Sequence, residues 1–215
     1  MTTTRLIERW LPIAELSEEA TRERRSMTAL PPNYYLHVWW ARRPLVASRA
    51  AVLASILPSD SSKSDFMHAL GIHGDPLRGA ALLDKAKRTG IPVSDPYGYK
   101  RAFNYAPNRR EIDHLLGKSR ENITVLDPTA GGGAIPLESV RLGLNTLSND
   151  LNPVAAFVEK VTIEFPLKHG ESLRHEYASV SERFRQLISE RLTTYIPASD
   201  NSEENVAFLW ARTVS

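Results

Sequence analysis

The stretch Asp127-Pro128-Thr129-Ala130-Gly131-Gly132-Gly133 joins an acidic side chain to consecutive glycines. Glycine adopts left-handed backbone angles without strain, and it lets a ligand approach the main chain because it has no Cβ atom. Asp127 is placed to order such a loop or to accept a hydrogen bond from an ammonium group. Asp150 follows 23 residues later, where a carboxylate can bind both hydroxyls of a ribose. The two acids and the loop indicate a ligand with a ribose and a cationic amino acid end.

The spacing of the glycines excludes two common nucleotide loops. The loop is not G-x-x-x-x-G-K-[ST], so it does not predict a site for nucleoside triphosphates. It also departs from G-x-G-x-x-G, which argues against a cofactor with a pyrophosphate. A tight turn that binds no ligand remains the alternative interpretation of the glycines.

The residues around the loop predict the order strand, helix, strand, helix. Residues 123–126 are apolar and rich in β-branched side chains, which is typical of a buried strand. Residues 135–142 have helical spacing and end at Gly143, residues 146–148 form a second short strand, and Pro153 opens another helix over 154–161. This order predicts a parallel sheet with right-handed crossovers, which binds ligands at the carboxyl ends of its strands.

These residues resemble a known family. The loop is similar to the motif D-P-F-x-G-x-G of DNA methyltransferases that modify adenine N6 or cytosine N4. The wider stretch 126–153 resembles large adenine-specific DNA methylases found near phage-defence genes, which often contain a zinc ribbon, and so do residues 37–45 and 97–103. The resemblance implies an α/β fold: part of a parallel, doubly wound, Rossmann-like methyltransferase sheet with an N-terminal helical attachment.

The resemblance also implies that the chain binds S-adenosyl-L-methionine. The loop would surround the methionine part, Asp150 would hold the ribose, the residues around Asn152 would border the adenine, and Arg43 would lie near the carboxylate. The cofactor-binding residues expected in this way are Arg43, Pro44, Asp127, Pro128, Thr129, Ala130, Gly131, Gly132, Gly133, Asp150, Leu151 and Asn152.

Two departures from the family pattern limit what this chain is expected to do. Thr129 stands where the wider class prefers phenylalanine. The catalytic tetrapeptide [D/N/S]-P-P-[Y/F/W], which binds the target amino group and stacks on the flipped base, does not occur. Residues 94–97, Ser-Asp-Pro-Tyr, come closest but lack the second proline and precede the loop. We therefore expect no catalytic residue here, and a second chain that carries the catalytic motif and the zinc ribbon, into which residues 208–214 would lead.

The first half of the chain has the charge of a surface that binds nucleic acid. Residues 1–120 hold 19 lysines and arginines against 12 acidic residues, whereas residues 121–215 hold 8 against 13. DNA is therefore an expected partner. Arg42, Tyr99, Lys100 and Arg101 are the candidate contacts, with a solvated surface or an ordinary loop as the alternative. Trp39 and Trp40 are expected to be buried beside the helix that follows Pro44.

Other segments carry expectations about structure rather than chemistry. Ser17 is placed to cap a helix in the charged N-terminal segment, and Phe184, Leu187 and Ile188 are expected to face inward from an amphipathic helix over 172–192. Residues 206–210 are typical of a strand. His68, His73 and Asp75 have no spacing that fixes a metal geometry, so we expect no metal site.

Composition sets the general class. With 42% hydrophobic and 24% charged residues, no cysteine and no apolar run of membrane-spanning length, the sequence is typical of a globular cytoplasmic protein without a membrane segment or disulfides. We expect a basic helical region over 1–118 and a cofactor-binding half-domain over 119–215 that stops before the zinc ribbon and catalytic motif. The expected function is the S-adenosylmethionine-binding subunit or fragment of a split DNA amino-methyltransferase in phage defence or restriction-modification, inactive alone. A non-catalytic DNA-binding or assembly module of a defence complex, with a vestigial loop, and a decayed fragment remain alternatives.

Overall fold

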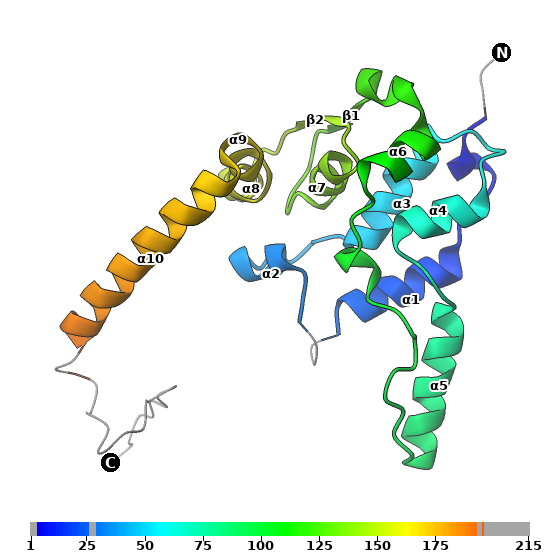
Figure 1. The fold of residues 1–215 in the computed structure, drawn as a ribbon, viewed down its shortest axis with the longest axis horizontal. Coiled ribbons are helices and arrows are strands. Elements are labelled where there is room, and N and C mark those ends of the chain that lie inside the picture. The colour runs from blue at the N-terminus through cyan, green and yellow to red at the C-terminus, as the bar shows by residue number, and fades with distance from the viewer. Residues whose placement is uncertain (1–3, 26–28, 193–194, 196–215) are drawn as a thin grey trace. The chain divides into compact units, whose positions relative to one another are not determined.

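The computed structural model describes residues 4–25, 29–192 and 195. The chain forms two compact units, residues 1–167 and 168–215. Within the described residues the fold is mixed α/β, mostly helical, with a sheet of two parallel strands (Figure 1). The elements in chain order are η1 (Leu6–Glu8), α1 (Ile13–Glu23), α2 (Pro32–Leu36), α3 (Leu45–Ile56), α4 (Lys63–Leu70), α5 (Pro76–Thr89), η2 (Ala102–Asn104), α6 (Arg109–Leu116), η3 (Lys118–Asn122), β1 (Thr124–Asp127), α7 (Ala134–Arg141), β2 (Asn145–Ser148), α8 (Pro153–Glu159), η4 (Lys160–Glu164), α9 (Phe165–His169) and α10 (Glu171–Leu192).

Helix α3 is the centre of the first unit. Its residues are small or apolar on most sides, and Val46, Ala50, Leu53 and Ala54 are each at most 2% exposed. A helix that is apolar on most sides must be covered over most of its surface. Accordingly α3 contacts η1, α1, α4 and α7 (Figure 1).

A buried ion pair fixes α7 against α3. Arg49 Nε on α3 donates to Glu138 Oε2 on α7 at 2.6 Å, and both side chains are fully buried. Arg141 donates to the other oxygen of Glu138, also at 2.6 Å. Burial lowers the pKa of Arg49, and Glu138 opposes that shift. The pair matters for function because α7 begins directly after the glycine loop.

The expected strand–helix–strand–helix order is present, with small shifts in its bounds. Strands β1 and β2 pair in parallel, with Leu126 opposite Leu147. Helix α7 ends before Gly143, which has a φ of +70° as expected after a helix terminus. The expectation of a buried strand was wrong, because Leu126 is 64% exposed and Leu147 is 60% exposed. A short sheet with two described strands leaves one face uncovered.

Three other expectations were wrong. Ser17 does not cap a helix, since α1 begins four residues earlier and the Ser17 hydroxyl donates to the Ile13 carbonyl at 2.7 Å. Trp40 is 91% exposed, while Trp39 is half-buried. On α10, which belongs to the second unit, the apolar residues expected to face inward are exposed: Phe184 by 62%, Leu187 by 45% and Ile188 by 39%.

The strand expected over 206–210, like the segment 208–214, lies outside the described residues. In the described part of the chain, none of the helices combines the length and the apolar character that crossing a bilayer requires.

Candidate functional site

The glycine loop lies where the carboxyl ends of the two parallel strands meet. Strand β1 ends at Asp127, the loop follows, and α7 starts at Ala134. The Asn149 N–H donates to the Asp127 carbonyl at 2.9 Å, and the Ala130 N–H donates to the Asn149 carbonyl at 3.0 Å. These bonds hold the segment after β2 against the loop. They bring Asp127 and Asp150 to one edge of the sheet, as the sequence predicts for parallel strands.

The Asp150 carboxylate holds the loop in place. Its Oδ2 accepts a hydrogen bond from the Gly131 N–H at 2.8 Å, and its Oδ1 accepts one from the Asn152 N–H at 2.8 Å. Donation by the Asn152 and Gly131 amides lowers the pKa of Asp150. A carboxylate offers about four acceptor positions, so Asp150 retains capacity to accept hydroxyl groups while it orders the loop.

Asp127 also orders the loop, through a hydrogen bond to a residue two positions further along the chain. Its Oδ1 accepts a hydrogen bond from the Thr129 N–H at 3.1 Å. The ordering of the loop that we expected from Asp127 is therefore shared between both acids. Sequence reasoning missed the contribution of Asp150, because the Gly131 amide that binds it lies 19 residues earlier in the chain.

The glycines are required by Trp39 as well as by the turn. Gly131 has a φ of +55°, and a Cβ atom there would lie 2.9 Å from Trp39 Nε1. At Gly132 a Cβ would lie 3.1 Å from Trp39 Cβ. The indole therefore lies directly against the loop. Trp39 was expected to pack beside the following helix, so its contact with the loop is a finding of the structure.

A cavity of about 340 Å³ opens beside the loop, within the size range of small-molecule sites. Its walls combine the aromatic ring of Trp39, the cation of Arg43 and the two carboxylates. The lining residues are Trp39, Ala41, Arg42, Arg43, Asp127, Thr129, Ala130, Gly131, Gly132, Ala134, Ile135 and Asp150. Seven of the expected cofactor-binding residues lie here together: Arg43, Asp127, Thr129, Ala130, Gly131, Gly132 and Asp150.

The other expected cofactor residues do not line this cavity. Gly133 has a φ of +72° and occupies the N-cap position of α7, and Pro44 occupies that of α3. Asn152 caps α8, where its Oδ1 accepts from the Val154 N–H at 2.9 Å. Leu151 is 99% exposed, and Pro128 is also exposed. These five shape the backbone around the site, and none of them is a wall of it.

Arg42 is buried rather than presented to a nucleic acid. It is 4% exposed, and its guanidinium donates to the Gly132 carbonyl at 3.3 Å and to the His37 carbonyl at 2.7 Å. The same group lies 4.8 Å from the ring centre of Tyr34. This geometry corrects the expectation of a phosphate contact, because Arg42 instead supports the glycine loop through its hydrogen bond to the Gly132 carbonyl.

The aromatic and basic residues over 99–101 do not lie at this cavity. The Tyr99 hydroxyl donates to Glu19 Oε1 at 2.7 Å, and Arg22 lies 4.7 Å from the centre of its ring. Burial, followed by the hydrogen bond to Glu19, raises the pKa of Tyr99. Arg101 donates to the Ala29 carbonyl, and Lys100 is exposed. Tyr99 therefore supports the contact between α1 and the loop before η2, and of these three residues only Lys100 is exposed.

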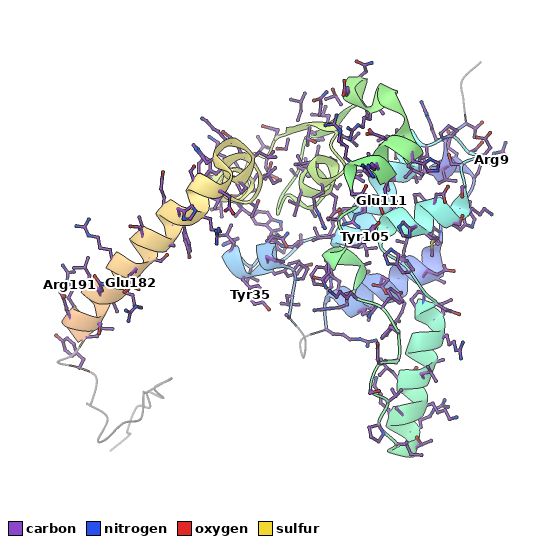
Figure 2. All side chains as sticks on the ribbon, in the orientation of Figure 1. Arg9, Tyr35, Tyr105, Glu111, Glu182 and Arg191 are labelled. Carbon is purple, nitrogen blue, oxygen red and sulfur yellow. The ribbon has the colours of Figure 1, made fainter. Side chains whose placement is uncertain are left out.

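The histidines belong to a small surface cluster. His68 Nε2 lies 3.1 Å from the Tyr105 hydroxyl and 3.4 Å from Glu111 Oε1, and the rings of His68 and His73 stack with centres 4.6 Å apart. Figure 2 labels Tyr105 and Glu111 of this cluster. Asp75 caps α5 instead of joining them. In the part of the chain that the structure describes, no group of three or more histidine, cysteine, aspartate or glutamate side chains could hold a metal ion.

Glu159 is a buried acid close to the loop. It is 7% exposed, its Oε1 has no hydrogen-bond partner, and its Cγ would lie 3.2 Å from a Cβ atom at Gly133. Burial raises its pKa, and the negative charges of Asp150 and Asp127 act in the same direction. The pattern of the sequence offered no signal for this residue, because it occupies an ordinary position in a helix.

Comparison with known proteins adds one match. A family model described as a protein of unknown function (DUF1156) matches residues 10–70, which span α1 to α4. No curated protein and no solved structure matches the chain. The matched stretch contains Trp39, Arg42 and Arg43, which contact or line the loop cavity although the loop itself lies outside the match.

Proposed function

We propose that this chain binds S-adenosyl-L-methionine and forms the cofactor-binding part of an enzyme that methylates an exocyclic amino group in DNA, on adenine N6 or cytosine N4. The observation that carries the proposal is the cavity beside the glycine loop. It joins two carboxylates, at the carboxyl ends of neighbouring parallel strands, to two arginines, Arg42 and Arg43, and to backbone that glycine leaves uncovered.

The chemical groups of the cavity fit the parts of this cofactor. Asp150 would accept hydrogen bonds from the ribose hydroxyls, Asp127 would face the ammonium group, and Arg43 would pair with the carboxylate. The bound cofactor supplies a methyl group on a sulfonium. The chain's residues would bind and orient it, because such transfer depends on in-line positioning.

The exposed face of the sheet supports a second chain. Leu126 and Leu147 lie opposite each other in the register and are both more than half exposed, and Leu151, three residues after β2, is 99% exposed. Large apolar side chains gathered on one face are typical of a surface that another polypeptide covers. We propose that the parallel pair is part of a doubly wound, Rossmann-like sheet, completed by a chain that carries the catalytic motif missing from this sequence.

The test of this assignment is a comparison of two ligands by calorimetry. S-adenosylmethionine carries the amino acid end that Arg43 and Asp127 would bind, and 5′-methylthioadenosine lacks it. The native chain should bind the first at least tenfold more tightly, since a hydrogen bond to a charged group contributes about 1.5–3 kcal/mol. Arg43→Gln should remove most of that preference. Equal affinity of both ligands for the native chain would exclude the proposed orientation.

A second candidate function is a non-catalytic DNA-binding or assembly module. The exposed apolar residues on α2 and just after it favour it: Tyr35 is 68% exposed, Val38 84% and Trp40 91%. Figure 2 shows Tyr35 on this helix. A chain that binds duplex DNA with a steep salt dependence, and shows no heat with S-adenosylmethionine, would support this candidate over the first.

A further inference from the structure

Helix α10 (Glu171–Leu192) carries an apolar stripe with the spacing of a coiled coil. It is one unbroken helix of 22 residues in the second unit (Figure 1). Alternating steps of four and three residues separate five apolar side chains, which form the α10 seam: Leu173, Tyr177, Val180, Phe184 and Leu187. This is the heptad repeat abcdefg, in which Tyr177 and Phe184 take position a and the other three take position d.

The α10 seam is largely uncovered. Tyr177 is 73% exposed, Val180 67% and Phe184 62%. All of α10 lies in the described part of the chain, and none of its residues is buried. Exposed apolar side chains in a continuous row are typical of a surface that another polypeptide covers.

The opposite face of α10 is polar and forms its own contacts. Glu182, Arg185 and Gln186 take the outer positions f, b and c. Arg185 donates to both carboxylate oxygens of Glu182, at 2.9 and 2.7 Å, and Gln186 donates to Glu182 Oε1 at 3.2 Å. This face is therefore suited to water, and the seam is the face that a partner would cover.

A partner for the seam must be a helix of similar length with the same repeat. Helix α10 is about 33 Å long at 1.5 Å per residue. Among the described residues the next longest helix is α5, which has 14 residues and contacts α1. A second copy of the chain supplies a helix that matches both the length and the repeat.

The charges beside the seam favour a parallel pair in register. In such a pair position g of one helix lies beside position e of the next heptad of the other. Glu176 then lies beside Ser181 of the second copy. Arg183 lies beside Ile188, which is also apolar and exposed. An antiparallel pair with the same apolar layers would instead bring Glu176 near Glu190 and Arg183 near its own counterpart, and like charges at an interface are unfavourable.

We propose that two copies of this chain associate through the α10 seam as a parallel two-stranded coiled coil. Arg191 takes the next position a and ends the apolar repeat. Since the helix spans only about three heptads, the dimer is expected to dissociate on dilution. This association does not rest on the function proposed above.

Size-exclusion chromatography with light scattering, over a range of concentrations of the full chain, tests the proposal. The native chain should form a dimer at high concentration. Val180→Glu and Phe184→Glu should each raise the dissociation constant at least tenfold, because two like charges would meet in one apolar layer. Ser179→Glu adds the same charge at an exposed position c and should leave the dimer unchanged. Far-UV circular dichroism at low concentration should be the same for all four chains, because these positions are exposed in a single copy.

Disulfide formation tests the parallel register. The sequence contains no cysteine, so one introduced thiol reports on one position. Val180→Cys should give a disulfide-linked dimer on oxidation, because residue 180 would face its own counterpart, whereas Ser179→Cys should not. In an antiparallel pair residue 180 would face Phe184.

Three results would overturn the proposal. A native chain that stays monomeric throughout would leave the seam to another segment or to a different partner. A dimer that tolerates both glutamates would have its interface elsewhere. Equal disulfide formation in Val180→Cys and Ser179→Cys would exclude the parallel register.

Discussion

Replacement of Glu138 by leucine is expected to destabilise the chain by about 3–5 kcal/mol, because it leaves a buried guanidinium without its carboxylate. Arg49 is fully buried and relies on Glu138 for the balance of its charge. It keeps hydrogen bonds to the Leu70 and Tyr105 carbonyls, at 3.2 and 2.8 Å, so the loss should fall toward the lower end of that range. Arg141 is 22% exposed and can be hydrated instead.

Thermal unfolding followed by circular dichroism measures this effect. For a chain of this size each kcal/mol lowers the Tm by about 2–4 °C, so a shift of roughly 6 °C or more is expected. Asp84→Leu is the matched control, because Asp84 pairs with Lys87 at 3.7 Å on the exposed surface of α5. Exposed pairs contribute at most about 1 kcal/mol.

The double variant Arg49→Met/Glu138→Leu tests the physical reason. If the unpaired charge causes the loss, removing both charges should recover most of the stability. A Glu138→Leu variant that loses no more than the Asp84 control would refute the reasoning. A double variant as unstable as the single one would assign the loss to packing instead.

Three more predictions concern the loop and its surroundings. Gly131→Ala should lower the free energy of unfolding by about 1–2 kcal/mol because of the left-handed φ, and further because the new Cβ atom meets Trp39. The loss should be smaller in Gly98→Ala, where φ is +71° and the space is open. Urea unfolding measures both variants, and equal losses would contradict the role of Trp39. Arg42→Leu should lower the free energy of unfolding by about 2 kcal/mol and weaken S-adenosylmethionine binding, since the Gly132 carbonyl loses a charged donor. A variant that binds the cofactor with native affinity in calorimetry would show that Arg42 does not position the loop. Burial raises the folded-state pKa of Glu159 above its ordinary 4.5, so the native chain should lose stability as the pH rises from about 4.5 to 7. Glu159→Gln lacks this titration and should therefore become more stable relative to the native chain over the same window. A difference between the two Tm values that stays constant with pH would contradict this prediction.

Local patterns predicted the part of the fold that carries the loop. The β-branched run before Asp127, the glycines and the cap at Gly143 each act within a few residues, so their structural meaning is readable from the sequence. Burial of the strand could not be predicted in this way, because it depends on whether other elements lie against Leu126 and Leu147. The same limit applies to α10, whose apolar face is exposed in the described structure.

The site itself was predictable in its acids and glycines but not in its supports. Arg42 and Gly132 are 90 positions apart in the sequence, and the contact between them is visible only in three dimensions. Trp39 and Glu159 likewise reach the loop from distant segments. The sequence predicts Arg42 as a surface cation. Its burial depends on hydrogen bonds to the His37 and Gly132 carbonyls, which no local pattern reveals.

Calorimetric titration of S-adenosyl-L-methionine into the purified chain, with Asp150→Ala and Asp60→Ala in parallel, is the decisive test of cofactor binding. Asp150 lines the loop cavity, whereas Asp60 is exposed and does not line it. We expect measurable binding to the native chain and to Asp60→Ala, and at least tenfold weaker binding to Asp150→Ala. No affinity in the native chain, or an Asp150→Ala variant that binds as the native chain does, would contradict it.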